Sequence, residues 1–261
     1  DEKQRAWIFQ PGDRSWGNGE AMAEGMDDVW IEFNSRVTGQ PTRLHGLWLA
    51  APRPGAPVLL YLHGARWNVT GSAFRIRRMQ ELGFSVLAID YRGFGKSSKD
   101  LPSEAMAGED ARAAWDWLAT RYPDRHRYIF GHSLGGAIAI DLATRVNDER
   151  GTIVEGTFSS IPDLASTMKW GWLPIGPLIT QRFDSMGKVA AIGSPLLVVH
   201  GSEDRLIAPS LARKLFDAAT GPKEFVLVEG GSHHNTNSVG QAQYREALAR
   251  LFRLPTSTAL R

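Results

Sequence analysis

The chain has 261 residues, of which 43% are hydrophobic, enough for a sizeable core in one large domain or two small ones. Its 30 basic and 28 acidic residues are interleaved and leave a formal charge of +2, so no basic stripe indicates nucleic acid as a partner. Cysteine is absent, which excludes disulfides, thiolate metal sites and cysteine nucleophiles.

The sequence contains no run of about 18 apolar residues, so we expect no membrane span, and it shows no signal-peptide pattern. The chain begins at Asp1 without a methionine, which leaves room for a removed leader or anchor. We therefore expect a cytoplasmic protein by default, or an extracytoplasmic or membrane-attached one if such a segment was removed. The oligomeric state stays open.

The first predicted strands form a hairpin. Residues 28–35 and 42–52 alternate polar and apolar side chains with a period of two, and the turn-rich "RVTGQP" lies between them. This pattern predicts two antiparallel strands at one edge of a sheet. The preceding residues 1–27 are interpreted as an N-terminal extension.

Apolar runs typical of strands buried on both faces follow the hairpin and alternate with stretches of helical spacing. The runs cover 58–64, 84–90, 127–133, 195–201 and 224–230, and the helical stretches cover 73–83, 103–121 and 210–219. Such alternation predicts a parallel sheet with helices on both faces. No repeat or linker divides the chain, so we expect a single mixed, mostly parallel α/β domain over 1–261.

Residues 157–191 break this rhythm with three prolines, three glycines and two tryptophans, and are interpreted as a small cap over the carboxyl edge of the sheet. Its large apolar residues favour an acyl chain or an aromatic group as substrate. Alternatively, they bury the cap against the domain. These residues are Met168, Trp170, Trp172, Leu173, Ile175 and Leu178.

One serine lies on a predicted strand-to-helix turn, in "RYIFGHSLGGAIAIDLA" from 127 to 143. Gly131, Ser133 and Gly135 match the G-x-S-x-G nucleophile elbow, in which glycines let the strand and the helix approach closely. The alternative is a tight turn whose serine merely caps the helix. The context of a buried strand before the turn and an alanine-rich helix after it favours the elbow.

A nucleophilic serine needs a histidine base and a carboxylate that orients the histidine. Asp204 follows a late strand in "LLVVHGSEDRLIAP", and His233 and His234 follow the last strand in "EFVLVEGGSHHN". The order nucleophile, acid, histidine is the one expected for this elbow. Only one of the two adjacent histidines can face Ser133.

Other acids and histidines have simpler interpretations. Asp90 precedes a glycine-rich turn and is expected to organise it, whereas Asp163 follows another strand and is the alternative acid. His132 is expected to pack structurally, and His63 and His200 to hydrogen-bond inside loops beneath the site. No histidine spacing is typical of a metal site, so we expect neither metal nor cofactor.

From about Trp30 onward the chain resembles the α/β-hydrolase superfamily, through "LYLHGARWN", "GFSVLAIDYRGFGKSS", "LPSEAMAGEDARAAWDWL" and "FGHSLGGAIAIDLA". These motifs are similar to a small-lidded branch with lysophospholipase-like, serine-aminopeptidase-like and protein-depalmitoylase-like hydrolases. The resemblance implies an eight-stranded sheet and backbone N–H donors from Ala65 and Leu134 in an oxyanion hole. It also favours His233 over His234 as the base, because the family histidine follows a short glycine-rich turn.

We therefore expect a serine hydrolase that cleaves carboxylic esters or thioesters through an acyl-serine. The expected substrate is a small-molecule or lipid-like ester, of which a lysophospholipid is one example, contacted by Trp67, Trp170 and Trp172. The first alternative is a serine aminopeptidase or amidase, in which Glu203 or Asp163 would pair with a substrate amine. The second is a hydrolase-fold binding module without chemistry.

Overall fold

The computed structural model of the chain describes residues 1–12, 19–169 and 171–255. Within these ranges the strands form one eight-stranded sheet in the order β1-β2-β4-β3-β5-β6-β7-β8. The strands are β1 (Asp27–Asn34), β2 (Pro41–Leu49), β3 (Val58–Leu62), β4 (Ser85–Ile89), β5 (Arg127–His132), β6 (Thr152–Glu155), β7 (Leu196–Gly201) and β8 (Lys223–Val228).

Antiparallel pairing in this sheet involves β2, which pairs with β1 on one side and β4 on the other, while the remaining strand pairs are parallel. The β1–β2 register runs from Asp27 opposite Trp48 to Asn34 opposite Pro41, which confirms the predicted hairpin. Every residue of β3 and β4 is buried, because helices cover both faces of the central sheet. The predicted mostly parallel, eight-stranded α/β sheet is confirmed.

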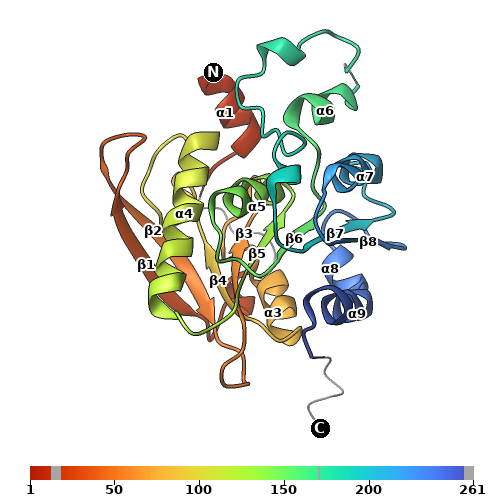
Figure 1. Cartoon of the computed structure of the whole chain (residues 1–261). Coiled ribbons are helices and arrows are strands. Elements are labelled where there is room, and N and C mark those ends of the chain that lie inside the picture. The colour runs from red at the N-terminus through yellow and green to blue at the C-terminus, as the bar shows by residue number, and fades with distance from the viewer. Residues whose placement is uncertain (13–18, 170, 256–261) are drawn as a thin grey trace.

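The helices pack in two layers around this sheet (Figure 1). They are α1 (Glu2–Phe9), α2 (Gly19–Met22), α3 (Ala73–Glu81), α4 (Glu104–Arg121), α5 (Leu134–Arg145), α6 (Ile161–Ser166), α7 (Pro209–Ala218), α8 (Thr236–Val239) and α9 (Gln241–Phe252), with 3-10 turns η1 (Gly176–Leu178) and η2 (Val189–Ala191). Across the described part of the chain, none of them has the length and apolarity needed to cross a membrane.

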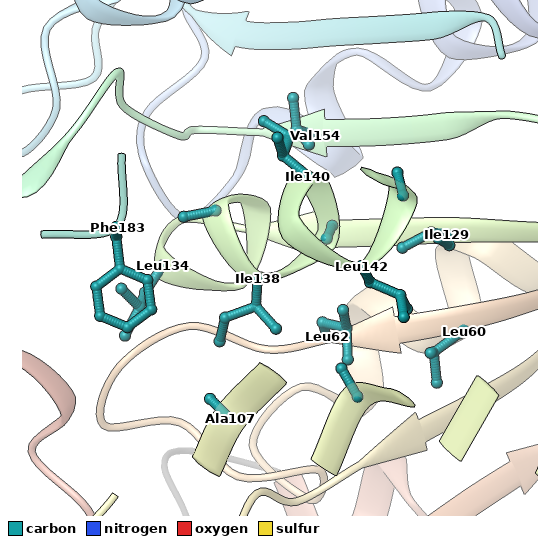
Figure 2. Packing of buried hydrophobic residues seen from close by; sticks show 14 of the residues in the cluster. Leu60, Leu62, Ala107, Ile129, Leu134, Ile138, Ile140, Leu142, Val154 and Phe183 are labelled. Atoms are coloured by element: carbon teal, nitrogen blue, oxygen red, sulfur yellow. The ribbon is translucent and has the colours of Figure 1, made fainter. Parts of the chain in front are cut away.

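Helix α5 is the central support of the sheet. Figure 2 shows Ile138 and Leu142 of this helix pointing toward Leu62 of β3 and Ala107 of α4, while Ile140 lies beside Val154 of β6. All these side chains are buried. Because α5 starts directly after Ser133, this packing holds the serine at the end of a rigid helix.

The N-terminal extension contains a helix that the sequence did not predict. Phe9 at the end of α1 is fully buried, with its ring 5.6 Å from Phe183 and 6.5 Å from Phe94. Its carbonyl accepts a hydrogen bond of 3.0 Å from the backbone N–H of Arg66, in the loop after β3. The extension is therefore part of the core, and it touches a loop that follows a central strand.

The predicted cap, residues 157–191, contains α6 and both 3-10 turns and lies at the same end of the molecule as α1 (Figure 1). Gln4 joins the two segments, since its side chain donates to Leu178 O at 2.8 Å and accepts from Thr180 N at 2.9 Å. A hydrogen bond of 2.8 Å from Ile161 N to Arg182 O joins an early and a late part of the cap.

Candidate active site

Ser133 occupies a strained turn between β5 and α5. Its φ of 57° lies in the left-handed region that a serine rarely adopts. A Cβ at Gly131 would lie 2.1 Å from Gly135 O, and a Cβ at Gly135 would lie 2.1 Å from Leu62 O. Both glycines are therefore required by close packing, as in a nucleophile elbow.

Two neighbouring loops meet at this turn. Ser133 N donates to Glu155 O at 2.9 Å, and Thr157 Oγ1 donates to Ser133 O at 2.9 Å. On the other side, a Cβ at Gly64 would lie 3.1 Å from Ser133 Cβ. The turn after β6 and the loop after β3 thus enclose the serine.

An acid–histidine pair comes from the loops after β7 and β8. His233 Nδ1 lies 2.8 Å from Asp204 Oδ2, and Asp204 Oδ1 accepts from the backbone N–H groups of Leu206 (3.0 Å) and Ile207 (2.8 Å). Burial raises the pKa of Asp204, but hydrogen bonds from His200 and His233 outweigh it and hold the pKa well below its usual range. A carboxylate can only accept, so Nδ1 of His233 carries the proton of this hydrogen bond.

The pair lies next to the serine turn. A Cβ at Gly156 would lie 3.3 Å from His233 Nδ1 and 3.6 Å from Asp204 Oδ2. The residues on either side, Glu155 and Thr157, are the two that form hydrogen bonds with the backbone of Ser133. His132, directly before the serine, places Nε2 2.9 Å from His233 O. The structure thus brings Ser133, Asp204 and His233 around one turn.

The alternative residues have other contacts. His234 is exposed, with its ring 5.6 Å from that of Trp67. Asp163 Oδ2 accepts hydrogen bonds from Lys214 Nζ at 2.9 Å and Ser159 Oγ at 2.5 Å. The carboxylate bound to a histidine of the last loop is that of Asp204.

The loop after β3 carries the first predicted oxyanion donor. His63 Nδ1 lies 2.7 Å from Gly64 O, so the ring holds the carbonyl of the Gly64–Ala65 peptide. In a trans peptide the N–H points away from the C=O, so the Ala65 N–H faces away from this ring. The second predicted donor, Leu134, is the first residue of α5, where the helix dipole favours negative charge.

Asp90 contacts the loop after β3 and the turn that follows its own strand. Its Oδ1 accepts from Val69 N at 2.9 Å and lies 3.0 Å from His63 Nε2. A Cβ at Gly95 would lie 2.2 Å from Asp90 Oδ2, so the carboxylate packs against the glycine-rich turn that follows it.

The predicted substrate-contacting tryptophans differ in their surroundings. Trp67 is half-buried beside His234, whereas Trp172 in the cap is 74% exposed and Trp170 lies outside the described residues. The alternative that the apolar cap residues bury the cap against the domain is wrong for the described members. Those with large exposed fractions are Met168, Trp172, Leu173, Ile175 and Leu178.

Two buried charges near the site were missed in the sequence. Arg75 of α3 is 1% exposed and Glu155 at the end of β6 is fully buried, with Arg75 Nε 3.5 Å from Glu155 Oε2. The available signal was a charge on the buried face of the "AFRIRRMQE" helix and another closing the strand "TIVE". Over the described ranges, no three His, Cys, Asp or Glu side chains cluster closely enough to hold a metal ion.

Comparison with known proteins agrees with this architecture. The family model for serine aminopeptidase, S33, matches residues 54–186. Alpha/beta hydrolase domain-containing protein 17B of Xenopus tropicalis is 32% identical over 248 residues, which cover 92% of this chain and 81% of that protein. The lysophosphatidylserine lipase ABHD12 of Rattus norvegicus is 30% identical over 222 residues, 78% of this chain and 51% of the lipase.

Among solved structures, an esterase of Pyrococcus furiosus superposes with a TM-score of 0.73 at 19% identity, covering 94% of this chain and 97% of the esterase. This likeness shows the fold. The sheet, the elbow and the matched family model define an α/β hydrolase. The chain belongs to the serine aminopeptidase S33 family of the α/β-hydrolase superfamily.

Proposed function

We propose that the protein is a serine hydrolase that cleaves carboxylic esters through an acyl-serine intermediate. The observation that carries this proposal is the meeting of Ser133, in its strained turn, with the His233–Asp204 pair around residues 155–157. A hydroxyl, a histidine with Nε2 free and an ionised carboxylate are the three groups that acyl transfer to serine requires.

In the first half-reaction, Ser133 Oγ attacks the ester carbonyl carbon while His233 Nε2 takes the hydroxyl proton. The C=O electron pair moves to oxygen, and the oxyanion accepts hydrogen bonds from the N–H groups of Ala65 and Leu134. Collapse of the tetrahedral intermediate breaks the bond to the alcohol oxygen, which leaves with the proton from His233. Asp204 stabilises the imidazolium that exists between these two proton transfers.

In the second half-reaction, water takes the place of the alcohol. His233 removes a proton from water, the hydroxide attacks the acyl-serine carbonyl, and the second tetrahedral intermediate expels Ser133 Oγ, which regains the proton. The products are a carboxylic acid and the alcohol released earlier. The backbone donors keep their positions through both steps, so little reorganisation is needed.

An apolar acyl group is the proposed specificity. The exposed side chains of Met168, Trp172, Leu173, Ile175 and Leu178 give the cap an apolar surface that a hydrocarbon chain could cover. The relative named as a lysophosphatidylserine lipase and the neighbour named as an esterase support the same class of bond.

Amide cleavage is the second candidate, favoured by the family's description as serine aminopeptidase. An aminopeptidase needs an anionic group to bind the substrate amine. Of the two acids considered, Asp163 is bound to Lys214, while Glu203 is exposed beside the acid loop. Amide cleavage would therefore depend on Glu203, since Asp163 is already paired.

The test compares the wild type with Ser133→Ala on an activated aryl ester, on acyl esters of increasing chain length and on aminoacyl amides. We expect the folded variant to keep less than about a hundredth of the wild-type rate and to resist labelling by a fluorophosphonate probe. A labelled Ser133→Ala variant would reject the nucleophile, and faster turnover of aminoacyl amides than of esters would reverse the order of the two functions.

A further inference from the structure

A cluster of buried polar groups lies directly beneath the histidine loop. It contains the Arg75–Glu155 ion pair, with Tyr244 Oη donating to Glu155 Oε1 at 2.5 Å and Arg75 Nη1 donating to Tyr61 Oη at 3.2 Å. All four side chains are at most 1% exposed. None of them belongs to the proposed triad.

Stability alone does not account for this cluster. Moving two charges out of water is costly, and replacing a buried ion pair by well-packed apolar side chains is often neutral or stabilising. Sheet and helices already supply large apolar surfaces on both sides of Arg75, including Ile76 and Met79 of the same helix. A charged group at this depth therefore suggests a geometric role.

The cluster reaches the histidine loop through two donors. Arg75 Nη2 donates to His234 O at 3.1 Å, and His132 Nε2 lies 2.9 Å from His233 O. Burial, together with the nearby Arg75 charge, holds the pKa of His132 well below its usual range, so its ring is neutral. Because a carbonyl oxygen can only accept, the proton of this neutral ring is on Nε2.

These two bonds hold consecutive peptide planes of one loop. Each peptide unit is rigid, so fixing the oxygens of His233 and His234 restricts rotation about the backbone bonds that flank them. The direction of the His233 side chain depends on those rotations. In this orientation of the loop, His233 Nδ1 lies 2.8 Å from Asp204 Oδ2.

We propose that Arg75 and His132 are positioning residues, which hold the carbonyls of His234 and His233 and thereby direct the His233 imidazole between Asp204 and Ser133. The inference rests on the proposed function, because it assigns a role toward the proposed base. Glu155 contributes through two groups. Its carboxylate neutralises Arg75, and its backbone carbonyl accepts a hydrogen bond from the Ser133 N–H.

The main test is the double variant Arg75→Met/Glu155→Gln, which removes both charges together and so leaves no unpaired ion in the core. Arg78→Met is the matched control, because Arg78 lies on the same helix but forms an exposed pair with Glu81. We expect the double variant to fold and to lose about 10- to 100-fold in kcat with little change in KM, since a shift of about 1 Å in a catalytic group has this cost. The control should match the wild type.

A second pair of variants tests His132. Gln in its place retains an N–H donor, whereas Leu does not, so His132→Gln should keep most of the activity that His132→Leu loses. The readout independent of turnover is the low-field proton resonance of His233 Nδ1–H, which should be sharp in the wild type and exchange-broadened in the double variant and in His132→Leu.

Wild-type kcat and a sharp low-field resonance in the folded double variant would overturn the positioning role. A wild type that neither hydrolyses esters nor reacts with a fluorophosphonate would instead reject the proposed function. In that case the resonance alone decides the positioning role, because it reports the His233–Asp204 geometry without any substrate.

Discussion

Asp204 and His233 are 6% and 7% exposed, whereas Met168, Trp172 and Leu178 of the cap are 41%, 74% and 69% exposed. The first region consists of short loops between buried strands and helices, and its side chains are tied by hydrogen bonds to several elements at once. The second consists of short helical turns, joined to α1 through Gln4 and to α7 through the Asp163–Lys214 pair. The proposed catalytic side chains are therefore buried and bonded to several elements, whereas the cap surface proposed to meet the substrate is exposed.

The largest effect is expected from the acid. Asp204→Asn should lower kcat by about 10⁴-fold, because the amide favours the wrong tautomer of His233. Asp163→Asn is the matched control, since this carboxylate binds Lys214 and should change kcat little. Steady-state kinetics of both variants on one aryl ester check the expectation, and the reverse pattern would move the acid to Asp163.

The next effect concerns helix α1, which contacts both the cap and the loop after β3. Phe9→Ala should lower the free energy of unfolding by about 3–5 kcal/mol, because the ring is fully buried against Phe94 and Phe183. Trp7→Ala, on the same helix but 54% exposed, should change it by less than about 0.5 kcal/mol. Urea unfolding measures both, and equal values would show that α1 is not part of the core in solution.

A smaller effect is expected on the pH dependence of the free energy of unfolding, through the buried His132. The pKa of His132 is lowered by burial, so below about pH 6.5 the unfolded state binds a proton that the folded state does not. This term therefore stabilises the fold above that pH and is lost as pH falls, with a slope of about 1.4 kcal/mol per pH unit.

Urea unfolding at pH 7.5 and 5.5 tests this term. His132→Gln should lose less stability than the wild type between these pH values, because glutamine does not titrate. His126→Gln, at an exposed position, is the control. An identical loss in the wild type and His132→Gln would contradict a neutral, buried His132.

The parts that the sequence predicted are those specified by neighbouring residues. The elbow needs Gly131 and Gly135 at fixed positions around Ser133, and the loop holding Asp204 follows an apolar strand of ordinary length. Such features are readable because backbone sterics and strand periodicity act over a few residues. The same reasoning identified the β1–β2 hairpin.

The parts that it did not predict depend on contacts between distant residues. Helix α1 has almost no amphipathic pattern, and the partners of its residues Phe9 and Gln4 lie far along the chain. The residues themselves could not distinguish His233 from His234. In the structure His233 is oriented toward Asp204, and the loop that carries it is bonded to Arg75 and His132. No local sequence pattern relates these two residues to the last loop.

The smallest expected effect lies in the cap. Trp172→Ala should lower kcat/KM for a long-chain acyl ester by about threefold to tenfold, because a partly covered side chain contributes about 1 kcal/mol of apolar contact. It should change the rate on an acetate ester less, since an acetyl group has little apolar surface to bury. Leu227→Ala, 42% exposed on β8, is the control for a general loss of surface apolarity. An equal loss for both esters would place Trp172 in the support of the rigid region rather than in substrate selection, and no loss for either would remove it from the substrate-contacting residues.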